Sequence, residues 1–341
     1  MNPRSSDFRG RRSALTGEAD RPGSSSAFWH PCSPWVSTSS FLTFGFLLTL
    51  GLPSAAAGQE DPFGYGTPSD PGEIEFDRPE SWAMKYFTSV SLLTGLGVPG
   101  VVGEGNFVVA LEGGFVPTLS DEQRTVGFNG TKLEDLNKTS AFGRIRVTLG
   151  LTGDAEFTLA WVPPVELNGA QPNLFAAAVG VPLFRTEAAR VGVRVYGQIG
   201  SVSGDFTCDD ETVAAGDNPL LNPFGCERIS DDNTTQQYLG LELGVATEIG
   251  ESVEPYVTLG ANRFSTRFET NAVTNGTLDR STFETSGYTA HATAGVSFRV
   301  NDRVRIAGEA FYTPLGVERF GAASSSNDGL FNGRGMVEIR F

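Results

Sequence analysis

Residues 335–341 read GMVEIRF, and this stretch decides how the rest of the chain is interpreted. The apolar side chains of Val337, Ile339 and Phe341 alternate with side chains that are mostly charged. Neighbouring residues of a β-strand point to opposite faces, so a strand here has one apolar face and one polar face. We therefore expect the chain to end in an ordered amphipathic strand.

The same stretch resembles the last strand of bacterial outer-membrane β-barrel proteins. In that superfamily a final aromatic residue, apolar residues two and four places before it and a glycine near the start of the strand are read by the barrel-assembly machinery. Phe341, Ile339, Val337 and Gly335 match these positions. The resemblance implies an all-β, antiparallel, transmembrane up-and-down barrel in the outer membrane of a Gram-negative cell, in contact with lipid and lipopolysaccharide. The chain also resembles uncharacterised proteobacterial outer-membrane proteins, and this resemblance implies no particular activity.

Composition agrees with strands rather than helices. The 341 residues include 42 Gly and 25 Phe but only 3 Met. Glycine with aromatic and β-branched residues is typical of strands and tight turns. The mean hydropathy of −0.13 excludes a bundle of membrane-spanning helices. It still allows a membrane β-barrel, in which only every second residue faces lipid.

An apolar run at residues 41–52 (FLTFGFLLTLGL) predicts a secretory signal peptide. The run is too short to span a bilayer comfortably, and Ala55 and Ala57 provide a small-x-small cleavage site. We expect cleavage after Ala57. The forty residues before the run reflect either a start codon assigned too early or an unusually long leader. Removing residues 1–57 leaves 20 basic and 37 acidic residues, and this excess of negative charge argues against nucleic-acid binding.

The mature chain divides into three predicted parts. Residues 58–81 are acidic and rich in Pro and Gly, which predicts a flexible periplasmic segment. Residues 82–104 place Trp82, Tyr86 and Val90 on one helical stripe. They predict a short helix or plug in or below the barrel, with an additional strand as the alternative. Residues 105–341 are the predicted barrel.

Amphipathic strands recur through residues 105–341 and number about ten, with twelve as the alternative. They lie within residues 107–115, 145–151, 157–161, 173–184, 191–199, 239–245, 257–261, 288–298, 304–312 and 335–341. Short turns at 152–154, 186–190, 250–253 and 301–302 alternate with longer polar links at 118–140, 163–172, 207–235, 271–282 and 313–329. Outer-membrane barrels have short periplasmic turns and long outer loops, so the alternation favours this fold.

The polar face of these strands is charged and is expected to line the lumen. The candidate lumen-lining residues are Glu112, Arg144, Arg146, Glu156, Arg194, Glu242, His291, Arg305 and Glu309. In a barrel of about ten strands, side chains of opposite sign on neighbouring strands are close enough to pair. The lumen is then either filled by paired charges or a narrow polar pore.

His291 is the one histidine of the mature chain. Outer-membrane phospholipases, lipid deacylases and omptin proteases use a His near the barrel rim with a Ser or acidic partner. His291 is expected at mid-strand, and no such arrangement surrounds it in the sequence. We predict no catalytic residue and no enzyme activity.

Cys208 and Cys226 are an even pair in two polar segments of an exported chain, which predicts a disulfide that closes an outer loop. Nearby acidic residues match no calcium-loop spacing. No metal and no cofactor are predicted. Residues 121–139 form a long loop of mixed charge that docks on lipopolysaccharide, folds back into the barrel mouth or stays solvated.

These observations predict a non-enzymatic outer-membrane barrel that acts as a small channel or in envelope structure, with a small solute as a conceivable partner. A lipid-active enzyme or a transporter of hydrophobic compounds is the alternative. Long-chain fatty-acid transporters resemble the chain in having an N-terminal plug, but they need more strands. A secreted β-sandwich or adhesin is a further alternative.

Overall fold

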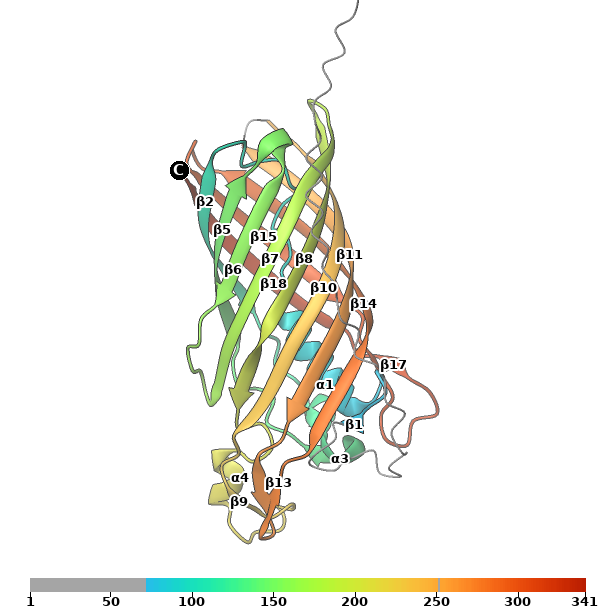
Figure 1. Cartoon of the computed structure of the whole chain (residues 1–341). Coiled ribbons are helices and arrows are strands. Elements are labelled where there is room, and N and C mark those ends of the chain that lie inside the picture. The colour runs from blue at the N-terminus through green and yellow to red at the C-terminus, as the bar shows by residue number, and fades with distance from the viewer. Residues whose placement is uncertain (1–71, 251) are drawn as a thin grey trace, which may run out of the picture. The chain divides into compact units, whose positions relative to one another are not determined.

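The computed structural model describes residues 72–250 and 252–341. The predicted leader and signal peptide, and most of the predicted flexible segment at 58–81, lie outside these residues. Ten antiparallel strands form a closed barrel, in which β18 pairs with β15 on one side and with β2 on the other (Figure 1). They are β2 (Phe107–Phe115), β5 (Ala141–Gly150), β6 (Glu156–Val162), β7 (Ala170–Arg185), β8 (Ala189–Gly204), β10 (Asp232–Thr247), β11 (Val253–Glu269), β14 (Thr282–Arg299), β15 (Val304–Thr313) and β18 (Leu330–Arg340). The predicted ten-stranded barrel is confirmed, and the twelve-strand alternative is wrong.

The connections separate by length onto the two ends of the barrel. Short turns, including η1 (Thr152–Asp154), lie at one end, which we call the turn end (Figure 1). Long connections lie at the other, the loop end, and contain short elements of their own. These are α2 (Asp121–Arg124), β3 (Thr125–Val126), α3 (Gly127–Gly130), β4 (Lys132–Leu133), α4 (Asp210–Ala214), β9 (Cys226–Arg228), β12 (Ala272–Thr274), β13 (Thr277–Asp279), β16 (Gly316–Val317) and β17 (Ser326–Asn327).

The outer face of the barrel is apolar and has aromatic residues near both ends. At the turn end the rings of Phe107 and Phe341 stack with centroids 5.0 Å apart. Toward the loop end Trp161 and Phe175 stack at 6.0 Å. Exposed apolar side chains of alternating strand residues lie between these levels. An outward apolar band between aromatic girdles is the surface that a membrane-spanning barrel needs.

One wall of the barrel is taller than the other. Strands β7, β8, β10, β11 and β14 have 16 to 18 residues, whereas the other five have 7 to 11. The long strands were predicted too short, because parts of their extensions at the loop end, such as TTQQ at 234–237, are polar on both faces. A short strand, β1 (Gly72–Glu73), pairs with the free edge of β14 and covers it.

Residues 72–81 are therefore structured, although the sequence analysis assigned them to a flexible segment without a core. Ile74 is 5% exposed and packs against Met84 and Phe283. This part of the chain lies at the loop end, because β1 pairs with the first residues of β14.

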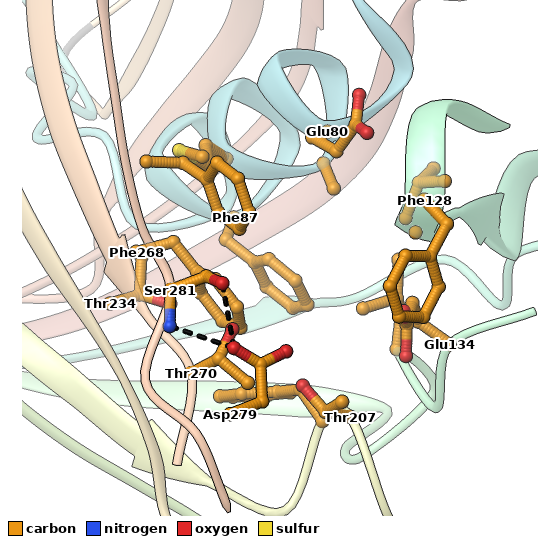
Figure 2. Close-up of a pocket in the computed structure, with 17 residues that line it drawn as sticks. Glu80, Phe87, Phe128, Glu134, Thr207, Thr234, Phe268, Thr270, Asp279 and Ser281 are labelled. Atoms are coloured by element: carbon orange, nitrogen blue, oxygen red, sulfur yellow. Dashed lines mark hydrogen bonds between the residues drawn. The ribbon is translucent and has the colours of Figure 1, made fainter. Parts of the chain in front are cut away.

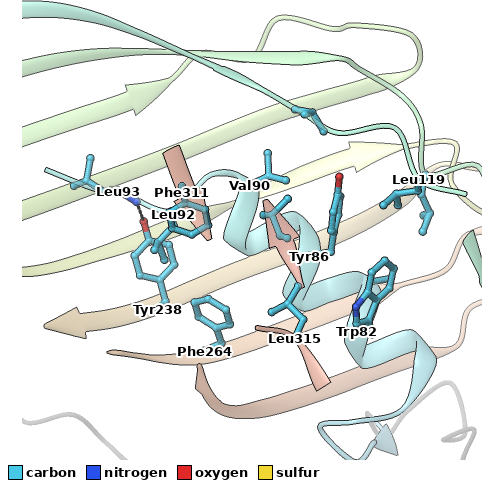
Figure 3. Packing of buried hydrophobic residues seen from close by; sticks show 14 of the residues in the cluster. Trp82, Tyr86, Val90, Leu92, Leu93, Leu119, Tyr238, Phe264, Phe311 and Leu315 are labelled. Atoms are coloured by element: carbon cyan, nitrogen blue, oxygen red, sulfur yellow. Dashed lines mark hydrogen bonds between the residues drawn. The ribbon is translucent and has the colours of Figure 1, made fainter. Parts of the chain in front are cut away.

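Helix α1 (Pro79–Val90) lies inside the barrel (Figures 1 and 3). Pro79 starts the helix, at a position where the backbone N–H that proline lacks would have no partner within the helix. The negative charge of Glu80 in the first turn interacts favourably with the positive end of the helix dipole. The predicted helix is confirmed and begins three residues earlier than residue 82. Trp82 and Tyr86 stack with ring centroids 5.5 Å apart in a cluster that inner-face residues of β10, β11 and β15 complete (Figure 3).

After α1 the chain continues through the bore to the turn end, where β2 begins. Residues 91–100 are buried, apart from the half-buried Gly95. We call residues 79–105 the plug segment. No helix in the described part of the chain is both long enough and apolar enough to cross a membrane.

Candidate functional site

Arginines of the barrel's inner face hold the end of helix α1. The last carbonyl groups of a helix have no partner within it and carry partial negative charge. Arg334 donates to the carbonyl oxygens of Ser89 (3.0 Å), Val90 (3.3 Å) and Leu92. Arg144 donates to the carbonyl oxygen of residue 91. These two guanidinium groups therefore act as the helix C-cap in a place that water does not reach.

Further arginines continue the same pattern along the plug segment toward the turn end. They are Arg146 on the carbonyl of Thr94 (2.9 Å), Arg305 on Leu96 (3.5 Å), Arg194 on Gly97 (3.3 Å) and Arg340 on Val101 (2.7 Å). An extended buried backbone needs a partner for each polar group, and here the barrel wall supplies them. The wall thus binds the plug through its backbone as well as through the apolar cluster around α1.

Glu156 accepts hydrogen bonds from backbone N–H groups of the plug, whereas the arginines donate to its carbonyl groups. One of its carboxylate oxygens accepts the N–H groups of Gly100 (2.9 Å), Val101 (2.7 Å) and Val102 (2.9 Å). Consecutive backbone N–H groups that converge on one point form an anion-binding nest. The wall thus satisfies donors as well as acceptors of the segment.

Ion pairs link the same inner-face residues to one another. Glu112 pairs with Arg144 and Arg146, Glu242 pairs with Arg194, and Glu338 pairs with Arg305. Glu309 accepts hydrogen bonds from Thr94 of the plug and from Tyr256 (3.0 Å). The nine candidate lumen residues all lie on the inner face; Arg305 is half-buried and the other eight are buried. The structure brings them together around the plug.

His291 lies deep in this network. Its Nε2 is 3.3 Å from Glu242, its Nδ1 is 3.1 Å from the amide nitrogen of Asn262, and its ring stacks on Phe311 at 5.5 Å. Only 3% of the residue is exposed. These three partners all come from strands of the barrel.

Arg334 is the principal residue that the sequence analysis missed. The analysis began the last strand at Gly335, but β18 begins at Leu330. The available signal was the period of two, which puts Arg334 on the same face as Met336 and Glu338.

Two inward-facing glycines give the plug room near the turn end. A Cβ atom at Gly180 would lie 2.6 Å from the ring of Pro99, and one at Gly192 would lie 3.0 Å from it. A side chain at either position would displace the plug.

At the loop end, a cavity of about 130 Å³ lies between α1, the β2–β5 connection and the tall wall (Figure 2). Three aromatic side chains meet in its lining. The ring of Phe206 lies 5.7 Å from that of Phe87 and 6.4 Å from that of Phe268. Ala83, Met84, Val126 and Leu136 also line the cavity.

The β2–β5 connection folds back over the barrel mouth to form one side of this cavity. Phe128, Asn129 and Gly130 have positive φ and make a left-handed turn, which the N–H of Thr131 closes onto the carbonyl of Gly127 (2.9 Å). The apolar side chains on either side of this turn can therefore pack against α1. Of the three arrangements considered for residues 121–139, folding back into the mouth is the one found.

Glu134 in this connection is a carboxyl group in largely apolar surroundings. Burial raises the pKa of Glu134 to about 7, although its hydrogen-bonded partner Lys132 acts in the opposite direction. Asp232 and Glu80 add smaller effects that also raise this pKa.

Another wall of the cavity is held by the β8–β10 connection. Cys208 directly follows the lining residues Phe206 and Thr207, and it forms a disulfide with Cys226 of the same connection. Buried Asp232 accepts the N–H groups of Thr207 (2.7 Å) and Asn271 (2.9 Å). Asp232 therefore fixes the β8–β10 and β11–β14 connections to each other beside the cavity.

The remaining predicted sites concern assembly and metals. The side chains of Val337, Ile339 and Phe341 point outward and are 46% to 61% exposed, and Gly335 lies opposite Gly113 of β2. Within residues 72–250 and 252–341, His, Cys, Asp and Glu side chains nowhere form a group of three or more that could hold a metal ion.

Neither a protein-family model nor a curated protein matches the sequence. Among solved structures, the chain is similar to the toluene transporter TbuX of Ralstonia pickettii, with 11% identity over 71% of this chain and 90% of that one and a TM-score of 0.33. It is also similar to the outer membrane protease OmpT of Escherichia coli, with 11% identity, coverage of 70% and 94% and a TM-score of 0.33. For the attachment invasion locus protein Ail of Yersinia pestis the identity is 14%, the coverage 70% and 99% and the TM-score 0.27. At these values the likeness carries no conclusion about activity.

Proposed function

We propose that this chain is a non-enzymatic outer-membrane β-barrel whose bore is closed by its own plug segment. The observation that carries the proposal is the set of hydrogen bonds between inner-face arginines and the backbone carbonyls of residues 89–101. Residues 91–100 of the segment are buried apart from the half-buried Gly95, so the segment occupies the bore. Of the two lumen states that the sequence allowed, the closed one is favoured.

The outer surface supports the proposed location. Exposed apolar side chains such as Leu241 (53%) and Leu259 (62%) lie on neighbouring strands between the aromatic levels. A surface of this kind is costly in water and stable in lipid. We expect the protein to fractionate with outer membranes and to show heat-modifiable mobility in gels.

The position of His291 supports a non-enzymatic role. Its imidazole is 3% exposed and packed between Glu242 and Phe311 on the inner face of the barrel. We assign it to the network that stabilises the closed bore.

Planar-bilayer recording tests the closed bore. We expect the wild-type protein to show no conductance or rare small events. In the double variant Arg144→Ser, Arg146→Ser the carbonyls of Ser91 and Thr94 lose their partners, so brief openings should become frequent. Arg263→Ser removes an arginine from the exposed outer face and should stay as quiet as the wild type.

Steady, large conductance in the wild-type protein would refute the proposal. Equal conductance in the double variant and in Arg263→Ser would show that the arginines do not hold the bore closed.

A further inference from the structure

The cavity at the loop end has a lining suited to an apolar occupant. Phe87 projects into it from α1 and Phe268 from the end of β11 (Figure 2). Phe206 of the β8–β10 connection also lines it. Aromatic rings arranged around a space offer edge and face contacts to another ring. Met84 adds a side chain that adapts to irregular shapes.

The charged groups in the lining already have partners within the protein. The pairs are Glu80 with the N–H of Asn129 (2.6 Å), Glu134 with Lys132, and Asp279 with the N–H of Ser281 (2.8 Å). An anionic occupant would therefore meet carboxylates, and a cationic one would have to displace existing bonds. The arrangement favours an occupant without charge.

The volume limits the size of the occupant. A cavity of about 130 Å³ is close to the ~150 Å³ engineered apolar cavity that binds benzene in another protein. The apolar side chains around a space of this size lack dispersion contacts that a ligand would supply.

We propose that this pocket binds a small uncharged molecule with a single aromatic ring. The inference goes beyond the closed bore and does not depend on it, because the pocket lies at the loop end and the arginine contacts lie farther inside. The walls come from α1, two long connections and the tall wall, so binding would stabilise the packing of the connections onto α1.

Fluorobenzene is a suitable probe, followed by fluorine NMR with the protein in lipid nanodiscs. Empty nanodiscs measure the partition into lipid, which does not saturate. The wild-type protein should add a saturable component. In Ala83→Phe a ring from α1 fills the cavity, and the affinity should fall at least about tenfold. Ala214→Phe makes the same change on the exposed surface of α4 and should bind within about twofold of the wild type.

Leu136→Ala tests the same pocket in the opposite direction. Removing this buried side chain enlarges the cavity, so the preference should move from fluorobenzene toward 1-fluoronaphthalene. Heat-modifiable mobility confirms folding of each variant. Anomalous scattering from crystals soaked in iodobenzene should place iodine among Phe87, Phe206 and Phe268.

The proposal fails if the wild-type protein shows no saturable component, or if Ala83→Phe binds as the wild type does. It also fails if Leu136→Ala leaves the size preference unchanged or if iodine is found only at other places. Since wild-type binding and the crystal position need no folded variant, the proposal can be tested even if both substitutions prevent folding.

Discussion

Arg334 joins the barrel wall to helix α1 through three carbonyl oxygens, and its guanidinium lies 4.1 Å from the ring centroid of Phe311. Burying a guanidinium is costly, and here hydrogen bonds and an aromatic face offset the cost. Loss of this side chain would leave helix carbonyls without partners in a site closed to water. Arg334 therefore contributes to the stability of the plug through its hydrogen bonds and its ring contact as well as through its charge.

Arg334→Met should lower the free energy of unfolding by about 3 kcal/mol, because methionine keeps the apolar stem and removes the donors. Urea unfolding followed by tryptophan fluorescence measures the change. In a Trp161→Phe background, Trp82 on α1 is the one tryptophan among residues 72–341 and reports on the plug directly. Arg263→Met on the outer face is the matched control. Equal urea midpoints for the two methionine variants would contradict the assigned role.

Glu134 gives the barrel mouth a pH dependence. Its pKa is about 7 in the folded chain against 4.5 for the free side chain, so the folded state binds the proton more tightly. The resulting stability is complete below pH 4.5 and is lost as the pH rises through about 7.

Between pH 5 and pH 8 the wild-type protein should therefore lose on the order of 2 kcal/mol from this group, and Glu134→Gln should remove that part of the dependence. The side chain faces Lys132, Asp232 and Glu80, whose charges stay in place in the variant. Urea midpoints across this range measure the effect. Glu122→Gln changes an exposed carboxylate of the same connection and should follow the wild-type profile. If Glu134→Gln follows it too, the assignment is wrong.

Single residues also show what could be predicted from the sequence. Period-two alternation placed Glu112 and Arg144 on the inner face, because strand geometry alone determines the face. The bond of Arg144 to the plug segment could not be predicted, because its acceptor is a backbone carbonyl, a group that every residue has. The cavity was missed because most of its lining comes from long connections and from strand residues near the loop end, and their proximity to α1 depends on the fold of the connections.

The elements at the loop end depend on one another. The disulfide between Cys208 and Cys226 spans 18 residues and fixes α4 and β9 beside the cavity wall. Loop-entropy arguments assign such a link roughly 3 kcal/mol of local stability. Because the connection lies beyond the strands, its release should leave the barrel itself intact.

Cys208→Ser, Cys226→Ser should make the connection sensitive to trypsin at Arg228, which is exposed within β9. We expect cleavage to become at least about tenfold faster, while heat-modifiable mobility of the barrel stays unchanged. Reduced wild-type protein should behave like the variant. Equal cleavage of oxidised and reduced protein, or two free thiols in the native protein, would sink this prediction.

The molecule as a whole is completed where β18 meets β2. Phe341 donates its N–H to the carbonyl of Phe107 (2.9 Å) and stacks on that ring, so it lies at the final seam of the barrel. We propose that Gly335, Val337, Ile339 and Phe341 also act as the signal for assembly, as the resemblance to outer-membrane barrels implies.

Phe341→Ala should slow insertion into outer membranes severalfold, measured as the appearance of the heat-modifiable form after synthesis. Phe331→Ala is the matched control, since Phe331 lies on the same strand at the loop end and is equally exposed, at 63% against 61%. Identical assembly rates for the two variants would count against both the seam and the signal.

The path of the plug segment has a topological consequence. Its chain enters at the loop end and leaves at the turn end to begin β2, so the finished ring of strands encircles a piece of its own polypeptide. A chain that threads a closed ring cannot leave sideways. The segment therefore either takes its place before β18 reaches β2 or passes lengthwise along the bore afterwards. Opening of such a barrel would require the plug segment to move along the bore. The segment would stay attached throughout, because the chain continues directly into β2.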